Sequence, residues 1–240
     1  MAASGSGGAK RRKRVPKTAS GRRRSENRRL QKLMELEQAY WDRGLSLIAG
    51  VDEVGRGPLA GPVLAAAVVL PPGVAIRGVD DSKKLNAARR SALYDEIRAK
   101  AVAIGVAGAS TREVDRINIL RASNLAMKRA IQRLHCTPEH VFVDGLPVAE
   151  LGAGHTAVVD GDAKVHCIAC ASIVAKVVRD RIMHLLATRY PGYGWETNAG
   201  YGTAEHRGAI IELGLTPHHR RSFEPNSQLT LELLQEDHAH

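Results

Sequence analysis

Three short apolar segments in this chain each run into acidic residues. They are Leu45–Val51 before Asp52 and Glu53, His140–Val143 before Asp144, and Thr156–Val159 before Asp160 and Asp162. A carboxylate at the end of a buried strand costs free energy unless its charge is compensated. In open α/β sheets, binding sites form where strands end. We therefore expect a sheet whose strand ends bring these acids to one site.

The rest of the chain reads as further strands and amphipathic helices. Two more strands are expected at Pro62–Leu70 and Val102–Ala109. The expected helices are 28–43, a helix capped by Ser82 or Asn86 and ending near Lys100, 111–115, 118–134, 167–188 and 204–213. Strands mixed with helices of this length predict an α/β domain with a mixed sheet covered by helices.

Positive charge is concentrated at the N-terminus. The net charge is +10, and residues 1–32 hold twelve lysine or arginine residues and one acid. We expect residues 1–27 to be disordered, because they have too little apolar surface to offset the entropy of ordering. This basic tail is either a solvated segment or an arm that binds a polyanion. A folded body is expected at residues 28–225, with a C-terminal tail at 226–240.

Composition also limits compartment and metal chemistry. No apolar run approaches the ~20 residues of a membrane span, so no membrane association is expected. The chain has only three cysteines, an odd number that favours a reducing, cytoplasmic location over a disulfide framework. Cys167 and Cys170 follow His166 and could form half of a zinc site. They lie in an expected helix with no second pair, which favours small core residues.

The acids themselves suit a hard metal ion. Carboxylate oxygens are the ligands that Mg²⁺ and Mn²⁺ prefer, although any one acid could instead cap a turn or a helix. Neighbouring residues of a strand point to opposite faces. Asp52 and Glu53 can therefore face one metal only if the strand is ending there, or if the longer side chain of Glu53 reaches round.

Gly55-Arg56-Gly57 follows the first pair of acids. Glycine lets a ligand approach the backbone closely and leaves its N–H and C=O groups accessible. An arginine between two glycines can bind a phosphate. The alternative is an ordinary tight turn with a solvated arginine. Beside a carboxylate site, this loop indicates a phosphodiester substrate.

At this point the chain resembles a known family. The run Asp52–Val63 (DEVGRGPLAGPV) is followed by shorter motifs at residues 81–85, 115–120, 143–145, 161–164, 171–176, 200–203 with His206, and 219–223. In type and order these motifs are similar to those of bacterial ribonuclease HII, the type 2 ribonuclease H. The resemblance covers residues 30 to 225 approximately.

The resemblance implies a ribonuclease H-like fold: a mixed five-stranded sheet flanked by helices, with a C-terminal helical extension. By motif match, the catalytic acids would be Asp52, Glu53, Asp144 and Asp162. The same four would bind the metal ions, either Mn²⁺ or Mg²⁺ in a two-metal site.

The resemblance also implies how substrate is read. Gly55, Arg56 and Gly57 would contact the ribose 2′-hydroxyl, and Tyr201 would stack on the sugar of the neighbouring deoxynucleotide. A packing role for Tyr201 is the alternative. One position departs from the family: Asp160 stands where a lysine is common. An extra carboxylate near the metals could strengthen cation binding or weaken phosphate binding.

The function implied is that of a monomeric endonuclease. It would hydrolyse the RNA strand of RNA–DNA hybrids and cut on the 5′ side of single ribonucleotides in duplex DNA, leaving 3′-hydroxyl and 5′-phosphate ends. That activity would remove ribonucleotides and RNA primers during replication and repair. One rival is a nuclease or recombinase of the same fold that cuts DNA. The other is a basic nucleic-acid-binding protein whose acids are structural caps.

Overall fold

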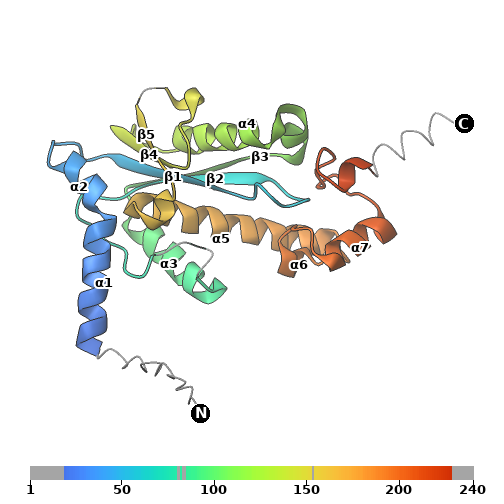
Figure 1. The fold of residues 1–240 in the computed structure, drawn as a ribbon, viewed down its shortest axis with the longest axis horizontal. Coiled ribbons are helices and arrows are strands. Elements are labelled where there is room, and N and C mark those ends of the chain that lie inside the picture. Colours follow the sequence, from blue (N-terminus) through green and yellow to red (C-terminus); the bar gives the residue numbers. More distant parts are fainter. Residues whose placement is uncertain (1–18, 80–81, 83–84, 153, 229–240) are drawn as a thin grey trace, which may run out of the picture.

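A mixed five-stranded sheet forms the centre of the protein (Figure 1). The computed structural model describes residues 19–79, 82, 85–152 and 154–228. The strand order is β3-β2-β1-β4-β5. The strands are β1 (Ile48–Val54), β2 (Val63–Val69), β3 (Ala103–Ala109), β4 (His140–Asp144) and β5 (His155–Val158). β2 runs antiparallel to β1 and β3, whereas β4 runs parallel to β1 and β5. The expected mixed sheet is confirmed.

Helices cover both faces of this sheet. They are α1 (Ala19–Leu33), α2 (Glu35–Trp41), α3 (Ala87–Lys100), α4 (Thr111–Gln132), α5 (His166–Arg189), α6 (Trp195–Asn198) and α7 (Ala204–Leu213), with short 3₁₀ turns η1 (Ala149–Leu151) and η2 (Gly161–Ala163). α4 packs on one face, and α3 and α5 pack on the other (Figure 1). Every residue of β2 is buried, which explains why that strand is an unbroken run of apolar residues.

α5 crosses the sheet at very close range. A Cβ added to Gly50 in β1 would lie 2.1 Å from the backbone carbon of Cys167, which is closer than any side chain permits. Cys167 and Cys170 lie in this first part of α5 and are buried. Burial raises the pKa of both thiols well above their ordinary value. The expectation that they are core residues is confirmed.

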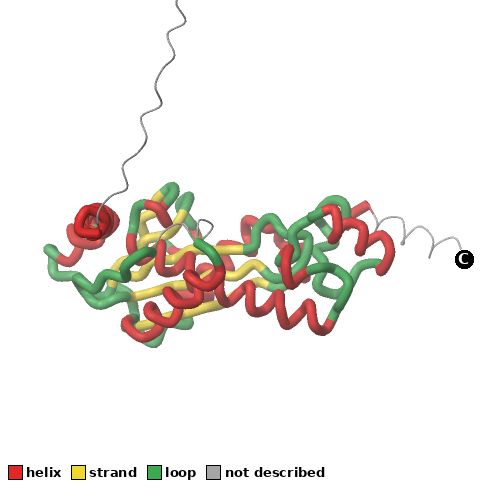
Figure 2. Tube along the Cα trace, turned by 90° about the horizontal axis from the view of Figure 1, so that it is seen from below, coloured by secondary structure: helices red, strands yellow, loops and turns green. Residues whose placement is uncertain are grey.

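A C-terminal helical part packs on the far half of α5 (Figure 2). Its core joins Met183 of α5 to Trp195 and Ile210, and to Leu59 and Ala60 of the loop between β1 and β2. This part matches the helical extension expected from the sequence. It extends beyond the expected boundary at residue 225, because Asn226 is completely buried and donates hydrogen bonds to Leu59 O and Arg220 O, at 3.1 and 3.0 Å. Residues 229–240 lie outside the described residues.

Two local expectations were wrong. Residues 19–27 are helical rather than disordered, because polar contacts hold α1 against the loop before α3: the Gly78 N–H donates to Glu26 Oε1 at 3.0 Å, and Arg77 donates to Asn27 Oδ1 at 2.7 Å. The helix expected at 28–43 is two helices, divided at Met34. Residues 1–18 lie outside the described residues.

For α3, the second of the two expected caps is confirmed. Its cap is Asn86, whose side chain accepts from the Arg89 N–H at 2.9 Å. Ser82 contacts Ser172 of α5 instead.

Within the part of the chain that the structure describes, no helix is long and apolar enough to cross a membrane.

Glu37 of α2 holds the beginning of α5. Its carboxylate accepts from the backbone N–H groups of His166 and Cys167, at 3.0 and 3.2 Å, and only 2% of the residue is exposed. The first N–H groups of a helix have no partner within it, so this carboxylate satisfies two of them. Burial raises the pKa of Glu37 to about 7.

We expect Glu37→Ala to destabilise the fold by about 1–3 kcal/mol, because two buried N–H groups lose their acceptor. Glu37→Gln keeps an acceptor oxygen and is the matched control.

The raised pKa of Glu37 also predicts that the wild type loses up to about 3 kcal/mol of unfolding free energy between pH 5 and pH 8, as a buried carboxyl becomes charged. Chemical denaturation at both pH values measures this. Equal pH dependence in wild type and Glu37→Gln would contradict it.

Candidate active site

The parallel pairing of β1 with β4 brings two of the acids together. Val51 and Val143 are register partners, so Asp52 and Asp144, one residue further along each strand, lie at the same edge of the sheet. β5 pairs with β4 in turn. The short η2 turn after β5 carries Asp162.

A cavity of about 220 Å³ opens at this edge. The residues lining it are Asp52, Glu53, Val54, Gly55, Arg56, Gly57, Ser82, Asp144, Asp162, Ser172, Lys176 and Tyr201. All eight site residues expected from the sequence are in this set. They come from β1, the loop after it, β4, η2 and the segment before α7, so folding assembles the cavity from distant parts of the chain.

Asp52 is the most buried of the acids, with 7% of the residue exposed. Burial raises its pKa well above the ordinary value, and the nearby charges of Glu53 and Asp144 raise it further. The Glu53 N–H donates to Asp52 Oδ1 at 2.7 Å, and a hydrogen bond with Ser172 also favours the charged form. Asp52 therefore lies where a cation would be favoured.

Glu53 also lines the cavity, although β1 continues past it to Val54. The strand does not end at these acids, so the first of the two expected explanations is wrong. Glu53 Oε1 pairs with Arg56 Nη1 at 3.2 Å. Glu53 Oε2 is buried without a hydrogen-bond partner. Burial is the largest cause of its raised pKa.

The third and fourth acids come from β4 and η2. Asp144 Oδ1 accepts from the Gly161 N–H at 2.6 Å. A Cβ added to Gly161 would lie 3.1 Å from that same Oδ1 and 2.7 Å from the side chain of Ile168. Only glycine therefore fits comfortably between Asp144 and Asp162.

The donors present fit a hard divalent cation. All four acids offer carboxylate oxygens, and Glu53 Oε2 is a buried acceptor that lacks a donor. Unpaired buried acceptors are costly unless a ligand compensates them. Among the described residues, no three histidine, cysteine or acidic side chains are already grouped closely enough to hold a metal. Hydrogen bonds with protein groups engage Asp52, Glu53 and Asp144 instead.

Asp160 lies apart from this cavity. It has a left-handed backbone conformation, its side chain is 76% exposed, and it pairs with Lys164 at 3.7 Å. Among the described residues, it is not part of the cavity wall. The structure therefore does not place this carboxylate with the four acids, contrary to the expectation of an effect near the metals.

Tyr201 and the glycine loop face the same space. Tyr201 is 45% exposed as a whole residue, and a Cβ added to Gly57 would lie 3.7 Å from Tyr201 Cε1. The Tyr201 carbonyl accepts from His206 Nδ1 at 2.9 Å. Because nearly half of the residue is exposed, Tyr201 is not fully buried in the core.

Besides Val54 of β1, sequence reasoning missed three polar residues of the cavity wall: Ser82, Ser172 and Lys176. The hydroxyls of Ser82 and Ser172 lie 3.0 Å apart, and Lys176 pairs with Asp180 at 2.6 Å. All three belong to motifs that carried the family resemblance. Their membership in those motifs was the available signal, because no local pattern places a helix face in a cavity.

Comparison with known proteins agrees with this geometry. The sequence model described as Ribonuclease HII matches residues 49–226. Ribonuclease HII of Ruegeria pomeroyi is 57% identical over 190 residues, covering 79% of this chain and 81% of the relative. Ribonuclease H2 from Pyrococcus horikoshii superposes with a TM-score of 0.65 at 27% identity, covering 75% of this chain and 95% of that one. Bst-RNase HIII in complex with Mn²⁺ superposes with a TM-score of 0.60 at 18% identity, covering 76% of this chain and 68% of that one, and shows the shared fold alone.

The crowded acids predict a measurable response to metal. Asp52→Asn removes a buried charge that its neighbours repel, so its Tm without added metal should exceed that of the wild type by a few degrees, on the order of 2–4 °C per kcal/mol. Added Mn²⁺ should raise the Tm of the wild type, because a ligand that binds the folded state stabilises it. The mutant should respond much less.

Asp160→Asn is the matched control, since it makes the same change of charge outside the cavity. Its response to Mn²⁺ should equal that of the wild type. Thermal melts across a metal titration measure all three proteins. An undiminished response in Asp52→Asn would contradict the metal assignment.

Proposed function

Because this chain belongs to the ribonuclease HII family, we propose that it cuts on the 5′ side of single ribonucleotides embedded in duplex DNA, as well as within RNA–DNA hybrids. Members of this family are endoribonucleases that cleave RNA in RNA–DNA hybrids. The products would carry 3′-hydroxyl and 5′-phosphate ends. The three cysteines are free, which supports a reducing compartment, and we place the activity in the cytoplasm in ribonucleotide and primer removal.

One observation carries the proposal: the four acids, the glycine loop and Tyr201 line a single cavity. The acids suit a reaction at a phosphodiester. The loop and the ring suit recognition of a sugar. If the acids were only structural caps, there would be no reason for them to share a cavity with the glycine loop and Tyr201.

Asp52, Glu53, Asp144 and Asp162 would hold the divalent cations. When bound, such cations supply an activated water and neutralise charge on the scissile phosphate. No nucleophilic side chain is needed, so the other residues of the cavity would bind and orient the substrate.

Arg56 is half exposed, with 50% of its side chain accessible, and it is paired with Glu53. It can turn from that carboxylate to a substrate phosphate, which an arginine binds with two parallel hydrogen bonds. The backbone of Gly55–Gly57 would contact the 2′-hydroxyl, the group that distinguishes RNA from DNA. Tyr201 would stack on the next sugar.

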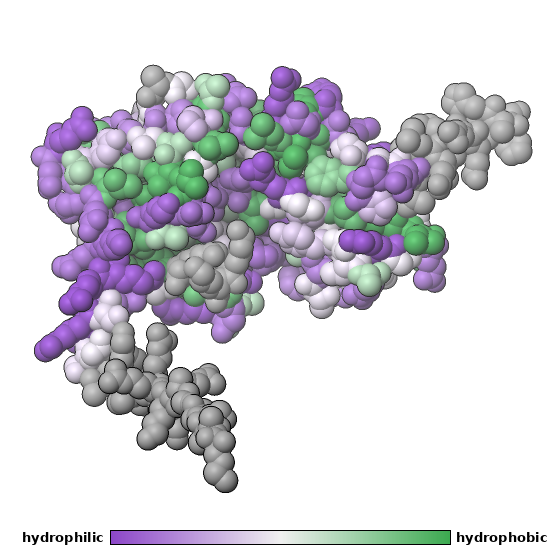
Figure 3. All heavy atoms as spheres, in the orientation of Figure 1, coloured by the Kyte–Doolittle hydropathy of each residue, from purple (hydrophilic) through white to green (hydrophobic). Residues whose placement is uncertain are grey.

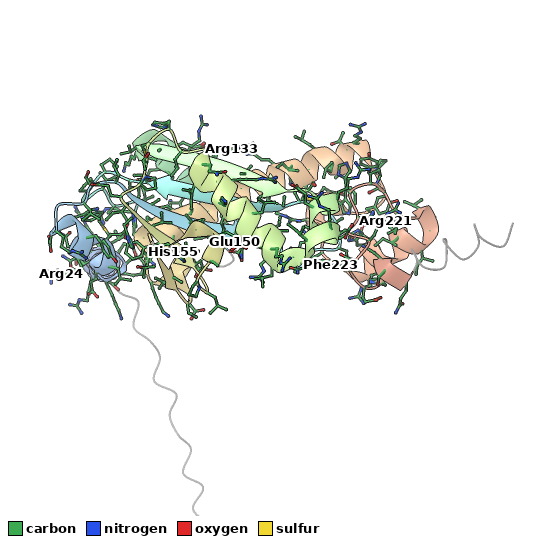
Figure 4. All side chains as sticks on the ribbon, turned by 90° about the horizontal axis from the view of Figure 1, so that it is seen from above. Arg24, Arg133, Glu150, His155, Arg221 and Phe223 are labelled. Atoms are coloured by element: carbon green, nitrogen blue, oxygen red, sulfur yellow. The ribbon has the colours of Figure 1, made fainter. Side chains whose placement is uncertain are left out.

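α1 adds a basic surface that favours a nucleic-acid partner. Arg23, Arg24 and Arg28 are exposed, and hydrophilic residues cover this helix in Figure 3. Arg24 points away from the sheet in Figure 4. Arg24 and Arg28 are four residues apart, so their charges repel each other on one face of the helix. A polyanion such as a duplex would relieve that repulsion.

The decisive experiment uses three substrates of the same sequence: a duplex with one ribonucleotide, an all-DNA duplex and an RNA–DNA hybrid. With Mg²⁺ or Mn²⁺, we expect cleavage on the 5′ side of the single ribonucleotide and within the hybrid, and none in EDTA. The all-DNA duplex should stay intact. Asp144→Asn should abolish cleavage without unfolding the protein, and Asp160→Asn should leave it unchanged.

Each rival makes a different prediction in the same assay. Comparable cleavage of the all-DNA duplex would identify a DNA nuclease. Binding without cleavage at any metal concentration would identify a binding protein. Near wild-type turnover of Asp144→Asn at saturating metal would remove the acids from the mechanism.

The role of Tyr201 predicts a difference between substrates. A stacked aromatic ring contributes about 1–3 kcal/mol, or roughly ten- to hundredfold in kcat/KM, by analogy with base stacking. Tyr201→Ala should lose most activity on a single ribonucleotide and less on a continuous hybrid, where the neighbouring sugar is ribose. Tyr201→Phe keeps the ring and should retain the activity. Equal losses on both substrates together with a lowered Tm would indicate a packing role.

A further inference from the structure

Arg220 lies behind the glycine loop and holds its carbonyl groups. Its side chain is completely buried. Nη1 donates to Arg56 O at 2.8 Å, Nη2 donates to Gly55 O, and Nε and Nη2 donate to Gly61 O at 3.1 and 3.0 Å. A single guanidinium therefore joins the two ends of the loop between β1 and β2.

Arg179 of α5 also donates hydrogen bonds to backbone carbonyls of this loop. It is also completely buried. It donates to Pro62 O at 3.1 Å, Ala60 O at 3.1 Å and Ala199 O at 3.0 Å. Ala199 lies two residues before Tyr201, so this guanidinium connects the glycine loop to the segment that carries the stacking ring.

Two glycines of the loop leave room for the side chain of Arg179. A Cβ added to Gly55 would lie 2.2 Å from Arg179 Nε, and one added to Gly61 would lie 3.2 Å from Arg179 Nη2. Both glycines also have positive φ angles, of 91° and 85°. The loop therefore lies directly against Arg179, with Arg220 gripping its carbonyl oxygens.

Neither guanidinium has a carboxylate partner among the described residues; backbone carbonyls are their acceptors. Burial lowers the pKa of both, that of Arg220 to about 9 with the charge of Arg179 as a second cause. Burying two like charges without a carboxylate in direct contact is costly, although the charge of Asp180 favours charged Arg179 and that of Asp115 favours charged Arg220 from further away. Apolar residues at these positions would stabilise the fold without the free-energy cost of burying a charge. A guanidinium has five donors in a fixed arrangement, so it can set the orientation of several peptide groups at once.

We infer that Arg220 and Arg179 are positioning residues for substrate discrimination: Arg220 fixes the peptide groups that read the 2′-hydroxyl, and Arg179 fixes the distance between that loop and Tyr201. This inference rests on the proposed function. Lysine keeps the charge but presents a single ammonium, which cannot span carbonyls on both ends of the loop.

The test compares Arg220→Lys with the wild type in the presence of Mg²⁺. The kcat/KM for the single-ribonucleotide duplex measures recognition with the 2′-hydroxyl. The inhibition constant of the all-DNA duplex of the same sequence measures binding without it. We expect kcat/KM to fall by about tenfold or more, as for a loss of one or two hydrogen bonds, while the inhibition constant stays within about twofold of the wild type.

Two controls separate positioning from stability. Arg221→Lys is the same substitution at the exposed neighbour (Figure 4), and it should change neither constant. Leu93→Ala removes core packing under α3; it should lower Tm without changing the ratio of the two constants. Arg179→Lys is the second variant, and it should lower kcat/KM on the single ribonucleotide in the same selective way.

The outcomes are distinct. An unchanged ratio in Arg220→Lys, or losses in both constants that follow Tm as in Leu93→Ala, would overturn the inference. If Arg220→Lys does not fold, an unchanged ratio in Arg179→Lys overturns it instead. A wild type that does not distinguish the ribonucleotide duplex from the all-DNA duplex would refute the proposed function itself.

Discussion

The parallel pairing of β1 with β4 is the constraint on which the site depends. It is set by apolar residues, Val51 beside Val143 and Gly50 beside Phe142, and it delivers Asp52 and Asp144 to one place as a consequence. A slip of one residue would turn every side chain of β1 to the other face. The core on both sides of the sheet therefore maintains a cluster of like charges that the acids alone would oppose. The apolar packing of the strands therefore offsets the repulsion between the acids.

The same cluster explains why the surroundings are rich in hydrogen-bond donors. Asp144 accepts from Gly161, Asp52 from the N–H of Glu53, and Glu53 from Arg56. These contacts satisfy three of the four carboxylates in the absence of a cation, so a bound cation would compete with them for the carboxylate oxygens. The partner groups are mostly backbone, which cannot swing away.

Sequence alone predicted the sheet and the meeting of the four acids in one place, because both leave local patterns. Apolar runs indicated the strands, and acids at their ends indicated the candidate site. Even the interruption of α4 was visible as two expected helices, and the structure shows Asn118 there with a positive φ of 66°. Arg179 and Arg220 could not be found in that way. Charged residues are expected at the surface, and nothing local indicates that backbone carbonyls far away in the chain will surround them.

α5 extends from the edge of the sheet that carries the acids to the C-terminal part as one uninterrupted helix of 24 residues. Its first turn lies against Gly50, and Arg179 and Met183 in its second half contact the loop after β1 and the segment before α7. At 1.5 Å and 100° per residue, inserting one residue between these ends would shift and rotate the far contacts out of reach. The helix thus fixes the distance between the proposed catalytic acids and the segments proposed to recognise the substrate. Related chains should vary freely in the length of their loops and tails, but not in the length of this helix between those two contacts.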